Sequence, residues 1–414
     1  MQEQAKTRIE KTVLSNGLTV ISEYVPAVRS VSVGVWVKTG TRYENALNNG
    51  IAHFLEHMVF KGTKRRSAFK IVQSIEELGG SLNAYTSKEL TVYYAHALDS
   101  QLTNCINVLS DMLCHSLFRQ RDIDREKQVV LEEISSVKDT PDEYIFDLFQ
   151  ENLFPHQPIG FPILGTVDSV KNITREELIE FWSKYYCSDN IVIAAAGNLQ
   201  HDRFVKVVEK KFNFLPQAFV VSFEQPQSAK NIDIELSEPL NQAHLCVGLE
   251  ALSYLSQDRY ALMAINSYLG GGMSSKLFQV IREKYGLAYS VFSFVDFFRD
   301  TGMLSFYIGT DKRNQKKALH ILFNEIDRLT QKELHKSRVQ KIKEQMKGNF
   351  LLALESSNRR MTRLARNEIY YNRQIELDEL VQSIEAISQD SLHAFSRNIF
   401  NFDHFNIVKL NPSH

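Results

Sequence analysis

Residues 53–57 read His-Phe-Leu-Glu-His, so two histidines stand four positions apart with a glutamate between them. In an α-helix, residues at this spacing lie on one face, about 5.4 Å apart along the axis. His53 and His57 can therefore bind one zinc ion through their imidazoles. Glu56 shares that face, where a carboxylate can accept a proton from a water made acidic by the metal. The segment predicts a hydrolytic zinc site, and the alternative is a chance pair of surface histidines.

The helix that would carry these residues has recognisable ends. Asn49 is a candidate N-cap, and Gly62 is a candidate C-terminal stop. A catalytic zinc usually has three protein ligands and one water, so a third ligand must come from elsewhere in the chain.

The acidic stretch at 124–137, DREKQVVLEEISSV, is a predicted helix that offers such a ligand. Glu126 and Glu133 are seven residues apart, close to two turns, and share a face. The adjacent Glu132 is a second candidate for the same role. Taken alone, a segment of this kind more often forms a solvated helix face.

The elements around these segments predict an α+β scaffold that occurs twice. Strands are expected on both sides of an Asn16-Gly17 turn, and a capping box, Thr174-x-x-Glu177, begins a helix. Further strands are expected at 30–40, 81–98 and 190–198, and helices at 99–116, 121–137 and 141–153. The second half repeats this order, with long helices at 313–330 and 334–366.

This repetition predicts two duplicated α+β domains, each a mostly antiparallel sheet packed with helices. The expected ranges are 1–214 for a zinc-binding domain, 215–230 for a linker and 231–414 for a homologous domain without zinc.

The H-x-x-E-H motif resembles the inverted zinc motif of the pitrilysin and mitochondrial-processing-peptidase family, the inverzincins. The likeness is to the short-chain bacterial or organellar branch and covers nearly the whole chain, including NGLTVISEYVP, VSVGVWVKTGTRYE, GGSLNAYTSKELTVYYAHAL and HQPIGFPILGT. In that family the third ligand is a glutamate roughly 70 to 80 residues after the motif. Glu133 follows His57 by 133 − 57 = 76 residues. The resemblance implies His53, His57 and Glu133 as ligands, Glu56 as general base and Glu126 as support behind the ligands.

The resemblance also implies where a substrate would lie. GGSLNAYTSKE is similar to the strand that pairs with the substrate backbone, which assigns Asn83 and Ala84 to substrate binding; the alternative is a plain core strand. The second half lacks the motif, so one zinc per chain is expected. It does contain Arg282 and Tyr289, spaced like a family pair that contacts substrate near the metal. Otherwise these two would be ordinary surface and core residues.

The function implied is that of a zinc-dependent endopeptidase that cleaves unfolded peptides in a closed chamber of four such domains. This chain would supply half of that clamshell. A homodimer is expected, in which each chain's Arg282 and Tyr289 serve the other chain's zinc, with a heterologous family partner as the other option. The alternatives are a non-catalytic structural or core-type subunit of a processing or respiratory complex, a zinc hydrolase of small molecules, and manganese or cobalt in place of zinc.

Composition excludes some classes of protein and suggests a compartment. The net charge of −1 gives no support to nucleic-acid binding, and no run of 18 apolar residues predicts a membrane span. The N-terminal residues have no apolar core of a secretory signal. The four cysteines form no C-x-x-C pair and are expected to be buried free thiols. We therefore expect a cytoplasmic protein, or a mitochondrial-matrix protein if the source is eukaryotic.

Overall fold

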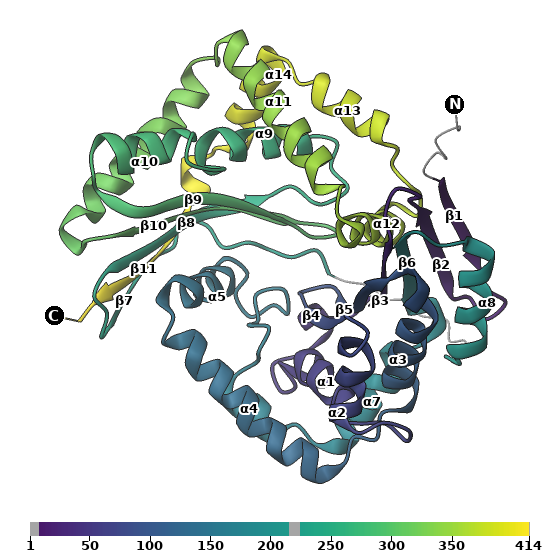
Figure 1. Cartoon of the computed structure of the whole chain (residues 1–414). Helices are drawn as coiled ribbons and strands as arrows, with labels where there is room; N and C mark the ends of the chain where they lie inside the picture. The colour runs from purple at the N-terminus through teal and green to yellow at the C-terminus, as the bar shows by residue number, and fades with distance from the viewer. Residues whose placement is uncertain (1–7, 215–223, 414) are drawn as a thin grey trace, which may run out of the picture. The chain divides into compact units, whose positions relative to one another are not determined.

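The chain folds into two compact units, each built on one β-sheet (Figure 1). The computed structural model describes residues 8–214 and 224–413. Among these, unit 1 draws on 8–134, 161–214 and 353–374, and unit 2 on 135–160, 224–352 and 375–413.

Unit 1 contains a six-stranded sheet in the order β1-β2-β6-β3-β5-β4. Only the β2–β6 pair is parallel. The central strand β3 carries valine at every second position, and this β-branched face lies in the core of the unit. The strands are β1 (Arg8–Val13), β2 (Thr19–Tyr24), β3 (Ser30–Val37), β4 (Ser81–Thr86), β5 (Thr91–Leu98) and β6 (Ile191–Gly197).

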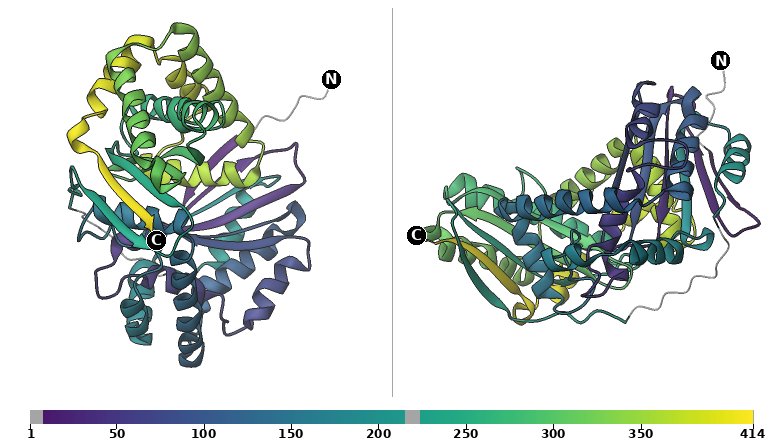
Figure 2. Two further views of the ribbon diagram at one scale, coloured as in Figure 1. Left: turned by 90° about the vertical axis from the view of Figure 1, so that its left-hand side faces the viewer. Right: turned by 90° about the horizontal axis from the view of Figure 1, so that it is seen from below.

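Unit 2 contains a five-stranded sheet in the order β7-β11-β8-β10-β9. Its one parallel pair, β7–β11, matches β2–β6, and the other strands match in order and direction. Figure 2 shows β11, in yellow, running to the C-terminus. This agreement confirms the duplicated α+β fold, to which unit 1 adds β1. The strands are β7 (Asp233–Glu238), β8 (Ala243–Ala251), β9 (Ala288–Phe297), β10 (Gly302–Thr310) and β11 (Asn406–Pro412).

Helices fill the connections in the same order in both halves. The first half has α1 (Ile51–Val59), α2 (Ala68–Glu76), α3 (Leu102–His115), α4 (Gln120–Lys138), α5 (Pro141–Leu153), α6 (Val167–Asn172), α7 (Arg175–Tyr185) and α8 (His201–Lys211). The second has α9 (Arg259–Gly270), the π-helix η4 (Phe278–Lys284), α10 (Gln315–Gln331), α11 (Lys336–Ala353), α12 (Ser357–Tyr371), α13 (Leu377–Glu385) and α14 (Gln389–Ile399). Short 3₁₀ turns are η1 (Thr41–Tyr43), η2 (Asp99–Gln101), η3 (Ser188–Asn190), η5 (Lys312–Asn314) and η6 (Phe402–His404).

Two helices belong to the unit built by the other half of the chain. Helix α5 packs on β8 and β11 of unit 2, where Phe149 and Leu153 are buried with Cys246 and Val408. Helix α12 packs on β2, β3 and β6 of unit 1, where Ser357 lies 2.9 Å from Ser32 between their hydroxyl oxygens.

This exchange means that the contiguous ranges 1–214 and 231–414 do not describe the compact units. An amphipathic helix can cover either sheet, and the sequence pattern contains no information about which one it covers. Of the expected linker, 215–223 lie outside the described residues, and 224–230 form no helix or strand.

Several local predictions are confirmed, and the extent of one helix is wrong. The β1–β2 hairpin turns at Gly17, and Thr174 and Glu177 form the expected capping box. The single helix expected at 334–366 is two helices, because the side chain of Ser356 accepts a hydrogen bond from Arg359 N–H and starts α12. All four cysteines are free thiols, and three are buried as expected, whereas Cys114 is only partly buried. In the described part of the chain, no helix has the length and apolar character needed to cross a bilayer.

Candidate metal centre

Helix α1 presents the two histidines on its polar face. Phe54, Leu55 and Met58 are buried in the core of unit 1 and fix the rotation of the helix. The remaining face carries His53, Glu56 and His57. The predicted motif is therefore helical, as its spacing required.

The start of α1 differs from the prediction. The N-cap residue is Gly50, in the left-handed region at φ +92°, and no side chain of that residue caps the helix. The amide of Asn49 instead donates to Pro162 O (3.0 Å) and to Glu44 Oε2 (2.9 Å). At the other end the helix stops at Val59, and Gly62 follows with φ +123°.

The side chains of His53, His57 and Glu133 converge on one point. Glu133 Oε2 lies 3.8 Å from His53 Nε2 and 3.6 Å from His57 Nε2. Ligand atoms around a tetrahedral zinc stand about 3.4 Å apart, given metal–ligand bonds of about 2.0–2.1 Å. Glu133 Oε2 is also buried without a hydrogen-bond partner, which leaves its lone pairs available to a cation. The donor set and its spacing fit zinc.

The neighbouring glutamate is placed differently. Glu132 is exposed, whereas Glu133 is partly buried and faces the histidines. Within residues 8–214 and 224–413, His53, His57 and Glu133 are the one group of three potential ligands close enough together for a metal ion.

Glu126 lies behind His57. Its Oε1 is 2.8 Å from His57 Nδ1, and its Oε2 is 2.7 Å from Lys61 Nζ. A carboxylate on Nδ1 holds the proton there and leaves Nε2 unprotonated toward the ligand cluster. Burial alone would raise the pKa of Glu126, but the hydrogen bonds from His57 and Lys61 outweigh it and lower that pKa.

The two histidines have different electrostatic surroundings. Burial, aided by the charge of His57, lowers the pKa of His53 to about 3, so its imidazole is neutral, the form that binds a metal. Burial would also lower the pKa of His57, but the hydrogen bond with Glu126 and the nearby carboxylates raise it.

Glu56 is oriented by a residue that sequence reasoning missed. The hydroxyl of Thr86, the last residue of β4, donates to Glu56 Oε2 at 2.6 Å. Burial raises the pKa of Glu56, and this hydrogen bond opposes the rise. Thr86 lies within the NAYTSKE stretch already singled out, so its place in that segment was the available signal.

The remaining predicted site residues lie on two strands and a π-helix. Asn83, which is exposed, and Ala84 lie on β4, the edge strand of unit 1. In unit 2, Arg282 of η4 places its guanidinium 4.8 Å from the ring centre of Tyr289 on β9. Tyr289 is 74% exposed, so the pair is open to a ligand.

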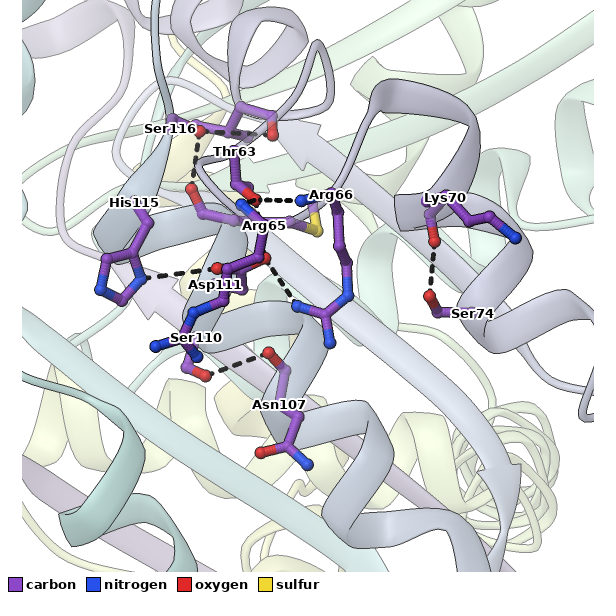
Figure 3. A network of polar contacts seen from close by, with 12 residues as sticks. Thr63, Arg65, Arg66, Lys70, Ser74, Asn107, Ser110, Asp111, His115 and Ser116 are labelled. Atoms are coloured by element: carbon purple, nitrogen blue, oxygen red, sulfur yellow. Dashed lines mark hydrogen bonds and ion pairs between the residues drawn. The ribbon is translucent and has the colours of Figure 1, made fainter.

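A polar network fixes the chain just after α1 (Figure 3). The buried carboxylate of Asp111 on α3 accepts from Thr63 Oγ1 (2.7 Å) and from Arg66 Nη1 (2.6 Å). Thr63 Oγ1 in turn accepts from Arg66 N–H (2.9 Å), and His115 Nδ1 lies 3.6 Å from Asp111 Oδ1. Thr63 and Asp111 are 48 positions apart in the sequence, so no local sequence pattern predicts this network.

Known proteins share both halves of the chain. Residues 19–167 match the family described as Insulinase (Peptidase family M16). A Bacillus subtilis (strain 168) protein named uncharacterized zinc protease YmxG is 39% identical over 412 residues, which is 98% of each chain. The chain belongs to peptidase family M16. Its length places it in the short-chain M16 branch, as expected.

Further matches agree with this M16 assignment. A Streptomyces coelicolor protein, uncharacterized zinc protease SCO5738, is 35% identical over 400 residues, covering 94% of this chain and 87% of its own. The crystal structure of a protease from Helicobacter pylori shares the fold with a TM-score of 0.90 at 24% identity, over 98% of this chain and 100% of that chain. A Pseudomonas fluorescens structure titled peptidase M16 inactive domain shares the fold with a TM-score of 0.91 at 19% identity, over 98% of each chain.

A second family model matches this M16 protein. Residues 172–346, which begin within the first half and extend into the second, correspond to the Peptidase M16 inactive domain. The H-x-x-E-H motif at 53–57 lies outside this range.

Proposed function

We propose that this M16 chain is a zinc-dependent endopeptidase that cleaves unfolded peptides. The observation that carries the proposal is the convergence of His53, His57 and Glu133, with Glu56 on the same helix face. The names of the relatives, which are zinc proteases, support it.

In this proposal His53, His57 and Glu133 hold one zinc per chain, and Glu126 orients His57. When bound, zinc supplies Lewis acidity that polarises a scissile carbonyl and lowers the pKa of a water toward 7. Glu56 accepts the proton of the attacking water and passes it to the leaving amine. Thr86 holds the Glu56 carboxylate in one orientation during both transfers.

The edge strand β4 supports a peptide as the substrate class. In the described residues its one partner strand is β5, so its other edge is available for a substrate strand. Pairing through main-chain groups of Asn83 and Ala84 would hold an extended peptide with little sequence preference. A folded protein offers no such free strand, which favours unfolded substrates.

We also propose that the active form is a homodimer that encloses the substrate in a chamber. The Arg282–Tyr289 pair, in which Tyr289 is exposed and Arg282 partly exposed, supports this, because its donors would contact substrate at the zinc of the partner subunit. A heterologous family partner is the competing arrangement, and size measurement of the purified chain separates the two. A cytoplasmic location is part of the same proposal.

The experiment that tests the function is cleavage of a mixture of unstructured peptides of roughly 10 to 30 residues, a length that an extended strand can present. Products are identified by mass spectrometry for the zinc-loaded chain, for the chain with chelator, and for Glu56→Gln. Cleavage confined to the zinc-loaded wild type supports a metallopeptidase. Absence of cleavage by a zinc-loaded dimer would favour a non-catalytic subunit.

A further inference from the structure

Glu44 is a buried carboxylate whose main partners lie at the start of α1. Only 5% of the residue is exposed, and it directly follows the turn η1. Its Oε2 accepts from Gly50 N–H at 2.7 Å and from the Asn49 amide at 2.9 Å. Its Oε1 accepts from Ala52 N–H at 2.8 Å. Both oxygens are therefore bound to the first turn of the helix that carries the predicted zinc ligands.

This arrangement replaces an ordinary N-cap. The Gly50 position has no side chain, and the first backbone N–H groups of a helix need acceptors from elsewhere. A carboxylate there also interacts favourably with the positive end of the helix dipole. A side chain at Gly50 is not possible, because an added Cβ would lie 2.6 Å from Leu164 O and 2.8 Å from Gly165 Cα. The cap must therefore come from Glu44, several residues earlier in the chain.

The two ends of α1 are held by different groups. After the helix, Lys61 pairs with Glu126, which also binds His57. Before the helix, the Glu44 carboxylate accepts a hydrogen bond from the N–H of Ala52, the residue next to His53. Loss of Glu44 would therefore loosen the turn that carries His53, while His57 remains tied to Glu126.

We propose that Glu44 is a positioning residue that holds the first turn of α1 and thereby places His53 for metal binding. This inference rests on the proposed function, since it assumes that His53 is a zinc ligand. It acts through the helix backbone, because Glu44 makes its hydrogen bonds to the turn that precedes His53.

The test measures metal binding by the full chain at pH 8, using zinc competition and the visible absorption spectrum after cobalt substitution. In Glu44→Gln, one acceptor oxygen becomes an NH₂ group facing N–H donors. We expect zinc affinity to fall about 10- to 100-fold, the usual cost of losing a group that orients a ligand, with an altered cobalt spectrum. Glu44→Asp, which keeps the carboxylate, should recover part of the affinity. Wild-type affinity and spectrum in Glu44→Gln would overturn the inference.

A matched control separates positioning from general destabilisation. Glu23 of unit 1 is also a buried glutamate, but it pairs with Arg360 on α12 and not with α1. Glu23→Gln should lower stability and leave zinc affinity and the cobalt spectrum unchanged. Equal losses of affinity in both variants would show a merely structural role and reject the inference.

Two further outcomes remain decisive. If Glu44→Gln does not fold, Asn49→Ala removes one donor from Glu44 Oε2 and should lower zinc affinity several-fold; unchanged affinity would then reject the inference. These readouts do not depend on cleavage. Zinc binding without peptidase activity would count against the proposed function while the positioning role is still measured.

Discussion

The helices α1 and α9 occupy the same place in two sheets that share five strands of the same order, and only α1 carries potential metal ligands. Each follows the central strand of its sheet, β3 or β8. Helix α1 contains His53, Glu56 and His57, whereas α9 reads RYALMAINSYLG and has no histidine or carboxylate. The duplicated fold therefore does not determine the chemistry, which depends on a few helix positions.

The second helix of the site shows the same contrast. In unit 1, α4 contributes the buried Glu126 and the ligand candidate Glu133. Its counterpart by element order in unit 2, α11, buries Lys343, whose Nζ lies 2.9 Å from Glu385 Oε2. The two helices therefore bury charges of opposite sign, and each buried charge is paired with a side chain of the other sign, Lys61 for Glu126 and Glu385 for Lys343.

The largest expected effect comes from Glu56, the proposed general base on α1. Glu56→Gln should lower kcat about 1,000-fold, because an amide cannot accept the proton of the attacking water. Zinc content, measured by atomic absorption, should stay at one per chain. The exposed Glu132→Gln serves as the control. Retained cleavage in Glu56→Gln would show that Glu56 is not the base, and the proposed catalytic difference between α1 and α9 would be wrong.

The next effect separates two adjacent glutamates of α4. Glu133→Gln should weaken zinc binding by more than about 100-fold, since it removes a proposed direct ligand. Loss of a residue that only supports a ligand already lowers metal affinity about 10- to 100-fold. Glu132→Gln should bind zinc as wild type does. Competition with a coloured chelator measures both. The reverse order of affinities would reassign the third ligand.

A smaller effect is expected from the group behind His57. Glu126→Gln should lower zinc affinity about 10- to 100-fold, because His57 loses the carboxylate that holds its Nδ1 proton. The variant should still bind one zinc at saturation. Calorimetric titration gives both values, and unchanged affinity would show that Glu126 serves only its ion pair with Lys61.

Glu44 makes unit 1 sensitive to pH. Burial raises its pKa from 4.5 to about 7, although hydrogen bonds from Ala52, Gly50 and Asn49 and the charge of Lys88 oppose the rise. The folded chain therefore binds more protons than the unfolded chain between these values, so this contribution to stability is lost as pH rises through 7. Between pH 5.5 and 7.5 the loss should be about 2 kcal/mol, and smaller in Glu44→Gln. Urea unfolding of both chains at the two pH values measures the difference, and equal losses would contradict the shift.

The smallest effect is expected in unit 2. Lys343→Met should change the free energy of unfolding by about 1 kcal/mol or less, because Glu385 is 39% exposed and water can solvate it. Zinc affinity should not change. Urea unfolding provides the measurement, and a change in metal binding would mean that the two units are not chemically separate.

The parts of the site that were predictable are those within one helix. The spacing of His53 and His57, and that of Glu126 and Glu133, follows from 3.6 residues per turn. The prediction that these two helices lie close together came from the resemblance to a family and not from the spacing. Thr86 and Glu44 were missed because their contacts with α1 depend on where β4 ends and how η1 turns, which are long-range properties.

At the level of the fold, the strands and their repeated order along the chain were more predictable than the helix packing. Alternating β-branched residues identified the strands, and their order repeated. The places of α5 and α12 were not predictable, because each has an apolar face that suits either sheet. The Asn49 prediction failed for a similar reason: its amide was satisfied by Glu44 and Pro162 and not by the helix it precedes.

The exchange of α5 and α12 has a consequence for biosynthesis. The last strand of the unit 1 sheet, β6, ends at Gly197, but Met361 and Leu364 of α12, buried in unit 1, are translated more than 160 residues later (361 − 197 = 164). Until α12 is synthesised, the face of this sheet that α12 contacts lacks that helix. Apolar surface exposed in this way makes an incompletely folded chain prone to aggregation. Completion of unit 1 is thereby tied to translation of the chain as far as α12.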